Sequence, residues 1–307
     1  MALHRLTSIT LGVPDVDDVA RYYGEFGLTR NTDGSFSTVD GGQQLRLQYA
    51  PARRLLHLGI GADDEDDIGR IASALRRIEI DVEPGEDHLR TVEPVAGFEV
   101  KVELAPRYAQ EPVQPAALNL PGHNERVDAR APGILREGQV LPRRLGHVVI
   151  GSVNREATER FFIDGLGFKV SDSIKDFATF MRCSTDHHNV FVQAAPVNFL
   201  HHTAWQVDDI DDVGRGAMAM LDGHPERHGW GIGRHYLGSN FFWYLKDPAG
   251  NFSEYYSDMD CIIDDQLWTP EILEGAKGLF SWGQPPPPSF LHPDDLAALM
   301  TGAHSMR

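Results

Sequence analysis

The chain has 307 residues, 41% of them hydrophobic and 24% charged, which is a globular composition with room for two domains. Its 45 acidic residues outnumber its 28 basic residues and give a net charge of −17, which argues against nucleic acid or an anionic membrane surface as a partner. There is no recognisable signal peptide, no apolar run of membrane-spanning length, and only two cysteines, Cys183 and Cys261. We therefore expect a cytoplasmic protein without a disulfide framework.

The first half contains two similar units. "LTSITLGVPDVDDVARYYGEFGL", from Leu6, reads as a strand, a helix and a glycine-bearing turn, and short strands with turn signals such as "DGG" follow. A second unit of the same kind begins near Leu55 with "LLHLGIGADDEDDIGR". Each unit predicts a βαβββ module, and residues 1–107 are expected to form one domain of two modules.

The second half repeats the first. After a Pro-, Gly- and polar-rich connector at 108–141, "LGHVVIGSVNREATERFFIDGLGF" matches the opening unit and "HHTAWQVDDIDDVGR" matches the second. Near-copies in the same order indicate a duplicated domain, predicted to cover 142–260. The tail, 261–307, contains a polyproline stretch and a short helix, and is interpreted as a packing arm or a flap over a pocket. The predicted fold class is α+β, with two tandem domains, each of two βαβββ modules that together form an open barrel around a pocket.

Three polar residues occupy equivalent places on strands of the second half. His147 and His202 lie in the strands that open its two modules, and Glu254 lies in the last strand between Phe252 and Tyr256. A carboxylate that points inward with aromatic neighbours is costly unless a cation accompanies it. Two imidazoles and one carboxylate form the facial arrangement of non-heme Fe(II) oxygenases. The sequence therefore predicts a divalent metal bound by His147, His202 and Glu254.

The first half provides an internal comparison for this interpretation. A buried histidine usually has only a hydrogen bond to satisfy, so each histidine alone is weak evidence for a metal. The aligned positions of the first half hold Ser8, His57 and, approximately, Lys101. Because the fold is built there without the triad, we expect the triad to be functional and the first half to be metal-free.

A further histidine of the second half is a candidate acid or base. His188, in "TDHHNVFVQAA", has an ordinary pKa near neutrality and could transfer protons; the alternative is a surface residue at a strand end. Its neighbour His187 is expected to face the other way.

Other polar side chains are sorted by their position in the pattern. His235 precedes a strand and Tyr244 lies within it, where its phenol could donate to a bound oxygen or simply fill the core. His201, His224 and His228 are predicted to lie in loops or on outer faces.

These residues lie within a known signature. The run "GRHYLGSNFFWYLKDPAGNFSE", from Gly233 to Glu254, resembles the signature of type I extradiol ring-cleavage (catechol) dioxygenases of the vicinal-oxygen-chelate superfamily. Trp243 departs from it, at a place where a smaller aliphatic residue or Phe is expected. "HHTAWQVDDIDDVG" is similar to the family's second-histidine strand, in which the second histidine of the pair is the ligand.

The resemblance implies a function and roles. His147, His202 and Glu254 would bind Fe(II), with Mn(II) possible; His188 would be the acid/base, and His235 and Tyr244 would contact substrate or oxygen. The implied reaction is extradiol (meta) cleavage of a catecholic compound by O2 in aromatic hydrocarbon catabolism. A homo-oligomer is expected.

Two other functions remain open on this scaffold. One is a glyoxalase-like metal-dependent isomerase or epimerase, which commonly has four protein ligands. The other is a metal-free protein that binds a small molecule. The ring substituent, the choice of iron or manganese, and proximal or distal cleavage are not determined by the sequence.

Overall fold

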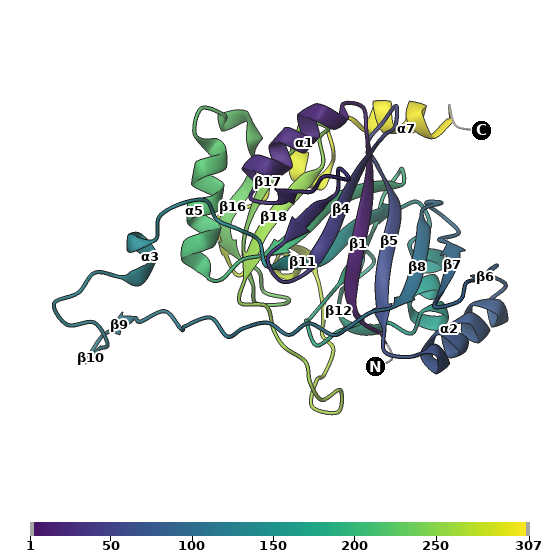
Figure 1. Ribbon diagram of the computed structural model, residues 1–307, viewed down its shortest axis with the longest axis horizontal. Coiled ribbons are helices and arrows are strands. Elements are labelled where there is room, and N and C mark those ends of the chain that lie inside the picture. Colours follow the sequence, from purple (N-terminus) through teal and green to yellow (C-terminus); the bar gives the residue numbers. More distant parts are fainter. Residues whose placement is uncertain (1–2, 305–307) are drawn as a thin grey trace.

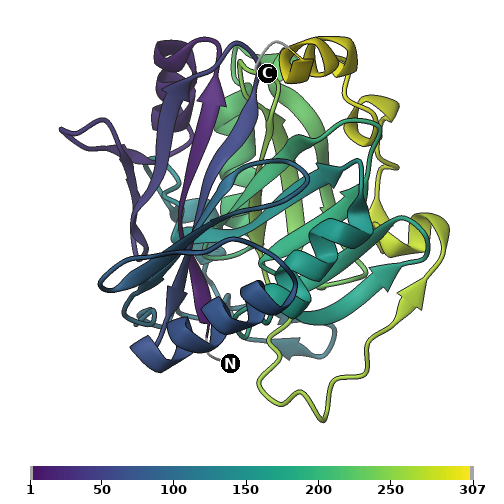
Figure 2. The ribbon, with the colours of Figure 1, turned by 90° about the vertical axis from the view of Figure 1, so that its right-hand side faces the viewer.

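The computed structural model describes residues 3–304. Its core consists of two twisted sheets, of eight and ten strands, and the central strands of the two sheets lie against each other (Figure 1). Helices lie along the outer sides of the sheets (Figure 2). The α+β class expected from the sequence is confirmed.

The first half folds into the eight-stranded sheet. Its strand order is β2-β3-β4-β1-β5-β8-β7-β6, so two modules join where β1 pairs antiparallel with β5. The elements are β1 (Leu3–Val13), α1 (Val16–Glu25), β2 (Thr29–Arg30), β3 (Phe36–Thr38), β4 (Gly42–Tyr49), β5 (Arg54–Ala62), α2 (Glu65–Arg77), β6 (Glu83–Pro84), β7 (His88–Val92) and β8 (Glu99–Leu104).

The second half repeats this plan in the ten-stranded sheet, of order β19-β12-β13-β14-β11-β15-β18-β17-β16-β20. The elements are β11 (Arg144–Ser152), α4 (Arg155–Arg160), η1 (Phe161–Gly165), β12 (Lys169–Ile174), β13 (Ala178–Arg182), β14 (Val190–Ala194), β15 (Phe199–Gln206), α5 (Ile210–Leu221), η2 (Pro225–Arg227), β16 (His228–Arg234), β17 (Phe241–Lys246) and β18 (Phe252–Ser257). Each half thus contains two βαβββ modules, as the repeats predicted.

The main helix of each module begins at a capping side chain. Asp15, Asp64, Asn154 and Asp209 each accept a hydrogen bond from the backbone N–H three residues later, over 2.8–3.2 Å. These caps satisfy N–H groups that the helix itself leaves free. The same local signal therefore begins the helix that follows the first strand of all four modules.

The connector and the tail behave differently. The connector extends away from the body and holds the short elements β9 (Asn119–Leu120), β10 (His123–Asn124) and α3 (Pro132–Leu135) (Figure 1). The tail follows the outside of the second half (Figure 2). Its elements are β19 (Ile272–Leu273), η3 (Gly275–Gly278), β20 (Trp282–Gly283), α6 (Pro288–Leu291) and α7 (Leu296–His304). Within residues 3–304, no helix combines the length and the apolar character needed to cross a membrane.

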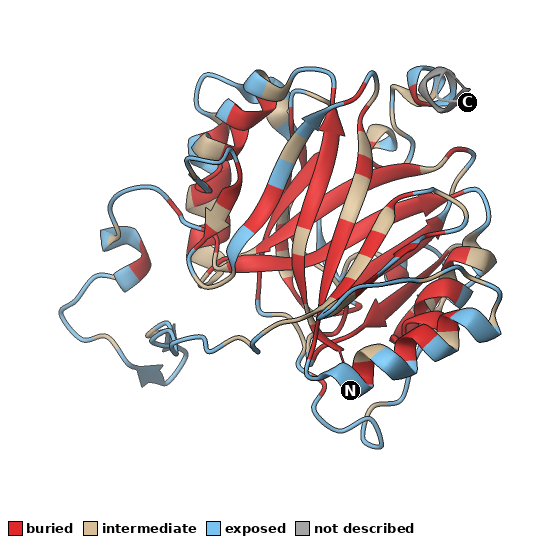
Figure 3. Cartoon of the chain, turned by 45° about the vertical axis from the view of Figure 1, so that its right-hand side comes forward, coloured by how far each residue is buried: buried red, intermediate tan, exposed pale blue. Residues whose placement is uncertain are grey.

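Aromatic contacts fix the two halves to each other. The rings of Phe26 and Tyr255 stack with centroids 3.9 Å apart, and the Tyr255 hydroxyl donates to the Phe26 carbonyl over 2.6 Å. The hydroxyls of Tyr22 and Ser253 are 2.5 Å apart. Both contacts anchor β18, which is buried along its whole length (Figure 3). The strand that carries Glu254 is therefore held rigidly from the side of the first half.

The strand register aligns the two halves residue by residue. In the second sheet, one cross-strand row runs from His147 through Ala204 to Glu254. The corresponding row of the first sheet is Ser8, Gly59 and Lys101. His202 lies two residues before Ala204 in the sequence, and His57 lies two residues before Gly59. The sequence alignment of His147 with Ser8 and of Glu254 with Lys101 is thus confirmed by the hydrogen-bonded ladders.

Candidate metal centre

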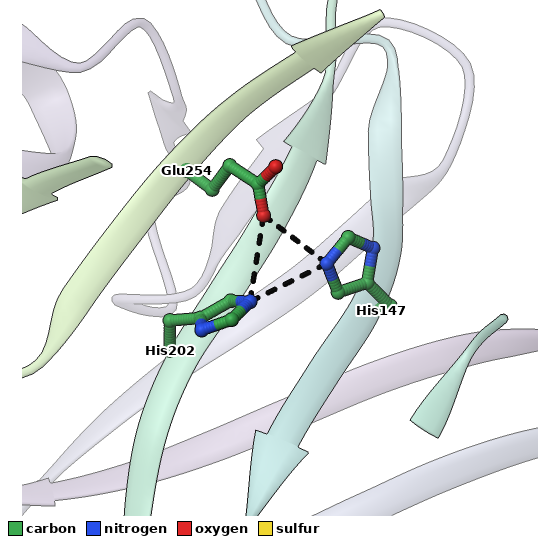
Figure 4. A group of neighbouring side chains, drawn as sticks. All are labelled: His147, His202 and Glu254. Atoms are coloured by element: carbon green, nitrogen blue, oxygen red, sulfur yellow. Dashed lines mark hydrogen bonds and ion pairs between the residues drawn. The ribbon is translucent and has the colours of Figure 1, made fainter. Parts of the chain in front are cut away.

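Three side chains from three adjacent strands meet at one point (Figure 4). Nε2 of His147, on β11, is 3.1 Å from Oε2 of Glu254, on β18. Nε2 of His202, on β15, is 3.4 Å from that oxygen and 3.4 Å from Nε2 of His147. All three residues are buried, and their ligand atoms lie within 4.8 Å of one another. The structure brings the predicted ligands together.

The charges at this point suit a divalent cation. Glu254 is fully buried, and its carboxylate is contacted by histidines and by the Asn240 amide at 3.1 Å; none of its ion pairs among the described residues involves Lys or Arg. Burial alone would raise the pKa of Glu254, but His147 and His202 outweigh it and hold that pKa below its usual value. Burial lowers the pKa of His202 to about 4. At neutral pH the site therefore offers an anionic oxygen and a neutral imidazole, the donor forms that metals bind.

His201 fixes the orientation of His202. Nε2 of His201 is 2.6 Å from the Phe290 carbonyl, which can only accept, so this nitrogen carries the proton. Burial lowers the pKa of His201 well below its usual value, so the ring is neutral and Nδ1 is an acceptor. The Nδ1–H of His202 donates to it over 2.8 Å, which leaves Nε2 of His202 as a lone pair at the metal position.

Sequence reasoning missed this role. His201 was predicted to lie in a loop or on an outer face, and this is wrong, because it lies within β15, is 3% exposed and lines the metal cavity. His224 and His228 are exposed, as predicted. The available signal was β15 itself, which is apolar on both faces and so had to be covered on its outer side as well.

His188 lies beside the ligands. Its ring centroid is 4.2 Å from that of His147, and burial lowers its pKa well below the usual value. Nδ1 of His188 is 3.0 Å from Nδ1 of His187. His187 does not line the metal cavity but is fully buried behind His188, with Nε2 2.6 Å from a carboxylate oxygen of Asp172. The sequence did not predict this contact.

His235 and Tyr244 form a hydrogen-bonded pair next to Glu254. Nδ1–H of His235 donates to the Leu279 carbonyl, so Nε2 accepts from the Tyr244 hydroxyl, 2.8 Å away. Nε2 of His235 is also 4.0 Å from Oε1 of Glu254. Burial raises the pKa of Tyr244 well above its usual value, so the phenol keeps its proton. Trp243, the departure from the signature, instead donates to His228.

These groups line one small cavity of about 50 Å³. Its walls are mostly aromatic or aliphatic, which suits a planar apolar ring. The tail closes one side with residues of η3, α6 and the segment between them. The lining residues are His147, Val149, Phe177, Phe180, His188, Phe191, Gln193, His201, His202, Trp230, His235, Tyr244, Gly278, Leu279, Phe290 and Leu291.

A larger hollow of about 640 Å³ lies on the equivalent face of the first sheet. Its polar side chains are engaged with each other: Lys101 with Glu103 over 2.5 Å, and His57 with Glu99 over 2.8 Å. Lys101 takes the register position of Glu254, so a cationic side chain stands where the second half has its carboxylate ligand.

Fold and site together define a mononuclear metal centre on a duplicated βαβββ scaffold, and comparisons with known proteins agree. The Glyoxalase/Bleomycin resistance protein/Dioxygenase superfamily matches residues 144–255. Metapyrocatechase 2 of Cupriavidus necator is 30% identical over 300 residues, covering 94% of this chain and 92% of that protein. The iron-dependent extradiol dioxygenase of Rhodococcus jostii is 26% identical over 154 residues, or 45% of this chain and 50% of that protein.

Among solved structures, the Mn(II)-bound glyoxalase of Novosphingobium aromaticivorans superposes with a TM-score of 0.75 at 26% identity, covering 95% of each chain. The chain belongs to the type I extradiol ring-cleavage dioxygenase family of the vicinal-oxygen-chelate superfamily.

Proposed function

We propose that this protein opens the ring of a catechol with O2 by extradiol cleavage, at a metal held by His147, His202 and Glu254. The metal is Fe(II) or Mn(II), and O2 is the co-substrate. The observation that carries the ligand assignment is the fully buried Glu254 carboxylate, with Nε2 of two histidines 3.1 and 3.4 Å from one of its oxygens. A charge so placed needs a cation, and these three donors occupy only one side of it.

A divalent metal at this position would supply a Lewis acid that binds two adjacent catechol oxygens and O2 together and lowers the pKa of a bound hydroxyl. The surrounding side chains would hold the ring, exclude water and transfer protons. Phe180 and Phe191 line the cavity and contact each other with ring centroids 4.4 Å apart, so they can hold the flat ring and exclude water.

His188 is the proposed acid/base. It is neutral, its Nδ1 is engaged by His187, and it lines the cavity, so Nε2 is free to take the proton of a substrate hydroxyl and to return it to a product oxygen. Tyr244 and His235 form the second proposed pair. The Tyr244 phenol stays protonated and can turn from His235 to donate to a substrate oxygen.

The tail must move for substrate to enter. A volume of about 50 Å³ holds little more than a water molecule, and Leu279, Phe290 and Leu291 of the tail form part of the wall. We propose that displacement of this segment admits the catechol and that its return shields the reaction from solvent.

The test is direct. Protein loaded anaerobically with Fe(II) is mixed with a panel of substituted catechols and then with air. We expect uptake of one O2 per catechol and a yellow ring-fission product. Fully metallated protein that consumes no O2 with any catechol would refute the proposal.

A glyoxalase-like isomerase is the second candidate, because the Novosphingobium protein of the same fold carries that name. Among the described residues, only three ligand side chains cluster at the centre, whereas such isomerases commonly use four. The two candidates differ in their need for oxygen. An isomerase would convert its substrate equally well under argon, and a dioxygenase would not.

The connector supports a homo-oligomer. β9 and β10 pair only with each other among the described strands, and an isolated two-stranded hairpin is barely stable in water. Leu118, Leu120 and Val127 are 55–73% exposed on it. We propose that the connector lies against a second copy of the chain, and that L118D/L120D lowers the mass measured by light scattering.

The free thiols of Cys183 and Cys261 support a cytoplasmic location.

A further inference from the structure

A hydrogen-bonded chain runs from β12 to the metal cavity through two consecutive histidines. Asp172, on β12, is 3% exposed and its Oδ2 lies 2.6 Å from Nε2 of His187. Nδ1 of His187 lies 3.0 Å from Nδ1 of His188. The His187 ring is held between Phe180 and Trp268, with centroids 5.5 and 5.6 Å away. The three polar side chains are thus fixed in line.

The proton positions follow from the end of this chain. Both oxygens of Asp172 accept hydrogen bonds, Oδ1 from the Glu271 backbone N–H over 2.6 Å and Oδ2 from His187. Nε2 of His187 therefore carries a proton, and in the neutral ring Nδ1 is an acceptor. His188 must then donate its Nδ1–H to His187, so that Nε2 of His188 has a lone pair.

We propose that Asp172, acting through His187, is a positioning residue that holds His188 in the tautomer whose Nε2 lone pair faces the metal cavity. This inference deepens the proposed function and rests on it for the effect on turnover. Without the carboxylate, the His187 ring could take the opposite tautomer, and His188 would then present an N–H where the mechanism needs a base.

The second histidine pair shows why the anchors differ. His201 orients His202 in the same way, but its Nε2–H donates to the Phe290 carbonyl and not to a carboxylate. A metal ligand needs only a fixed orientation. A base becomes positive when it takes a proton, and a carboxylate behind it stabilises that state. The charged anchor therefore stands behind His188, the residue proposed to move protons.

D172N tests the proposal with little change of shape. Asn has one acceptor oxygen where two are needed, so it either loses the Glu271 N–H or presents its NH2 to Nε2 of His187. We expect kcat to fall by about 10²-fold or more, the low end of what acid–base catalysis contributes, with KM and bound metal changing less than about 3-fold. An unchanged kcat in correctly metallated D172N would overturn the proposal.

Two further variants guard against a folding defect. H187F breaks the chain but leaves Asp172 bonded to Glu271, and its ring suits the neighbouring Phe180 and Trp268; it should lose kcat like D172N. D186N is the matched control. It removes a carboxylate next to His187 that pairs with Arg144, and it should keep kcat.

A double variant separates positioning from structure. If Asp172 acts through His188, then D172N added to H188F should cause no further loss of kcat. A further loss of the same size as in the wild-type background would show that Asp172 acts elsewhere and would overturn the proposal.

A spectroscopic measurement is independent of catalysis. In ¹⁵N-histidine-labelled, Zn(II)-loaded protein, long-range ¹H–¹⁵N spectra distinguish the two neutral tautomers. We expect the His188 signals, identified by their absence in H188F, to show Nδ1–H in the wild type and Nε2–H in D172N. The same tautomer in both would overturn the inference even in an active enzyme. The expected tautomers in a protein that cleaves no catechol would refute only the proposed function.

Discussion

Nδ1 of His201 and Nδ1 of His202 lie 2.8 Å apart, although consecutive side chains of a strand leave from opposite faces. The ladder between β11 and β15 is irregular here, because Val149 pairs with His202 and Ile150 with Leu200, so that His201 is left out of the register. His201 is bonded in turn to the Phe290 carbonyl of the tail. The tail and the metal ligand are therefore linked through one imidazole.

This link predicts weaker metal binding in H201F. The change leaves the Nδ1–H of His202 without an acceptor, and loss of such a partner typically costs about 10–100-fold in affinity. Metal titration of the apoprotein measures it. H224F, which changes an exposed histidine, should bind metal like the wild type.

The paired rows predict opposite outcomes for two equivalent histidines. H202A removes one of three donors and should leave less than about a tenth of the bound metal, since affinity depends on donor number. H57A removes the residue at the same register position of the first half, where Lys101 replaces the carboxylate, and should keep full metal content. Elemental analysis of both proteins decides it, and equal loss in the two would refute the assignment.

Turnover and metal binding should separate in H188F. His188 contacts the ligand His147 but is not one of the three clustered donors, so metal content should stay at the wild-type level. Ring cleavage should fall by about 10²–10⁴-fold, the range for loss of an acid–base group. Oxygen uptake and metal content are measured on the same sample; normal turnover would remove His188 from the mechanism.

The tail should loosen in R53Q. The buried guanidinium of Arg53 makes two hydrogen bonds to Asp295, at 2.7 and 2.9 Å, and one of 2.6 Å to the Leu200 carbonyl. We expect faster proteolysis of the tail, because R53Q removes these hydrogen bonds. The free energy of unfolding should fall by about 1–3 kcal/mol; the loss is moderate because water can solvate the partly exposed Asp295. R46Q breaks an exposed pair with Asp33 and should change neither.

Asp247 should make stability depend on pH. Burial raises its pKa to about 6, against hydrogen bonds from Asn251 that favour the charged form. The folded pKa exceeds the unfolded value, so protonation of Asp247 stabilises the folded state. This stabilisation is complete below pH ~4 and is lost as the pH rises through 6. The stability of D247N relative to the wild type should therefore increase by about 2–3 kcal/mol between pH 4 and pH 7. Denaturant unfolding of the metal-free proteins measures it, and a constant difference would contradict it.

The sequence predicted the modules and the ligands because both depend on local or repeated patterns. Strand alternation and the Asp-Asp-apolar-Gly-Arg repeat aligned the halves, and the ladders pair Gly59 with Lys101 as they pair Ala204 with Glu254. Once the halves were aligned, His147 stood opposite Ser8, so the fold itself does not require a histidine at this position.

The residues behind the ligands could not be found in this way. Alternation assigns His187 and His201 to the face away from their neighbours, and it says nothing about what covers that face. Asp172 comes from β12 and Phe290 from the tail, so both contacts depend on tertiary packing between segments far apart in the chain. Only the folded arrangement shows that both side chains are buried and what they contact.

The register of the first sheet also has a practical consequence for protein engineering. The row that ends in Lys101 lacks the two donors of its counterpart, because Ser8 and Lys101 stand opposite His147 and Glu254, and His57 already stands where the second imidazole is needed. S8H together with K101E would install the full donor set in the larger hollow. One polypeptide would then carry two metal sites, and the larger cavity around the second site could be redesigned to accept bulkier rings.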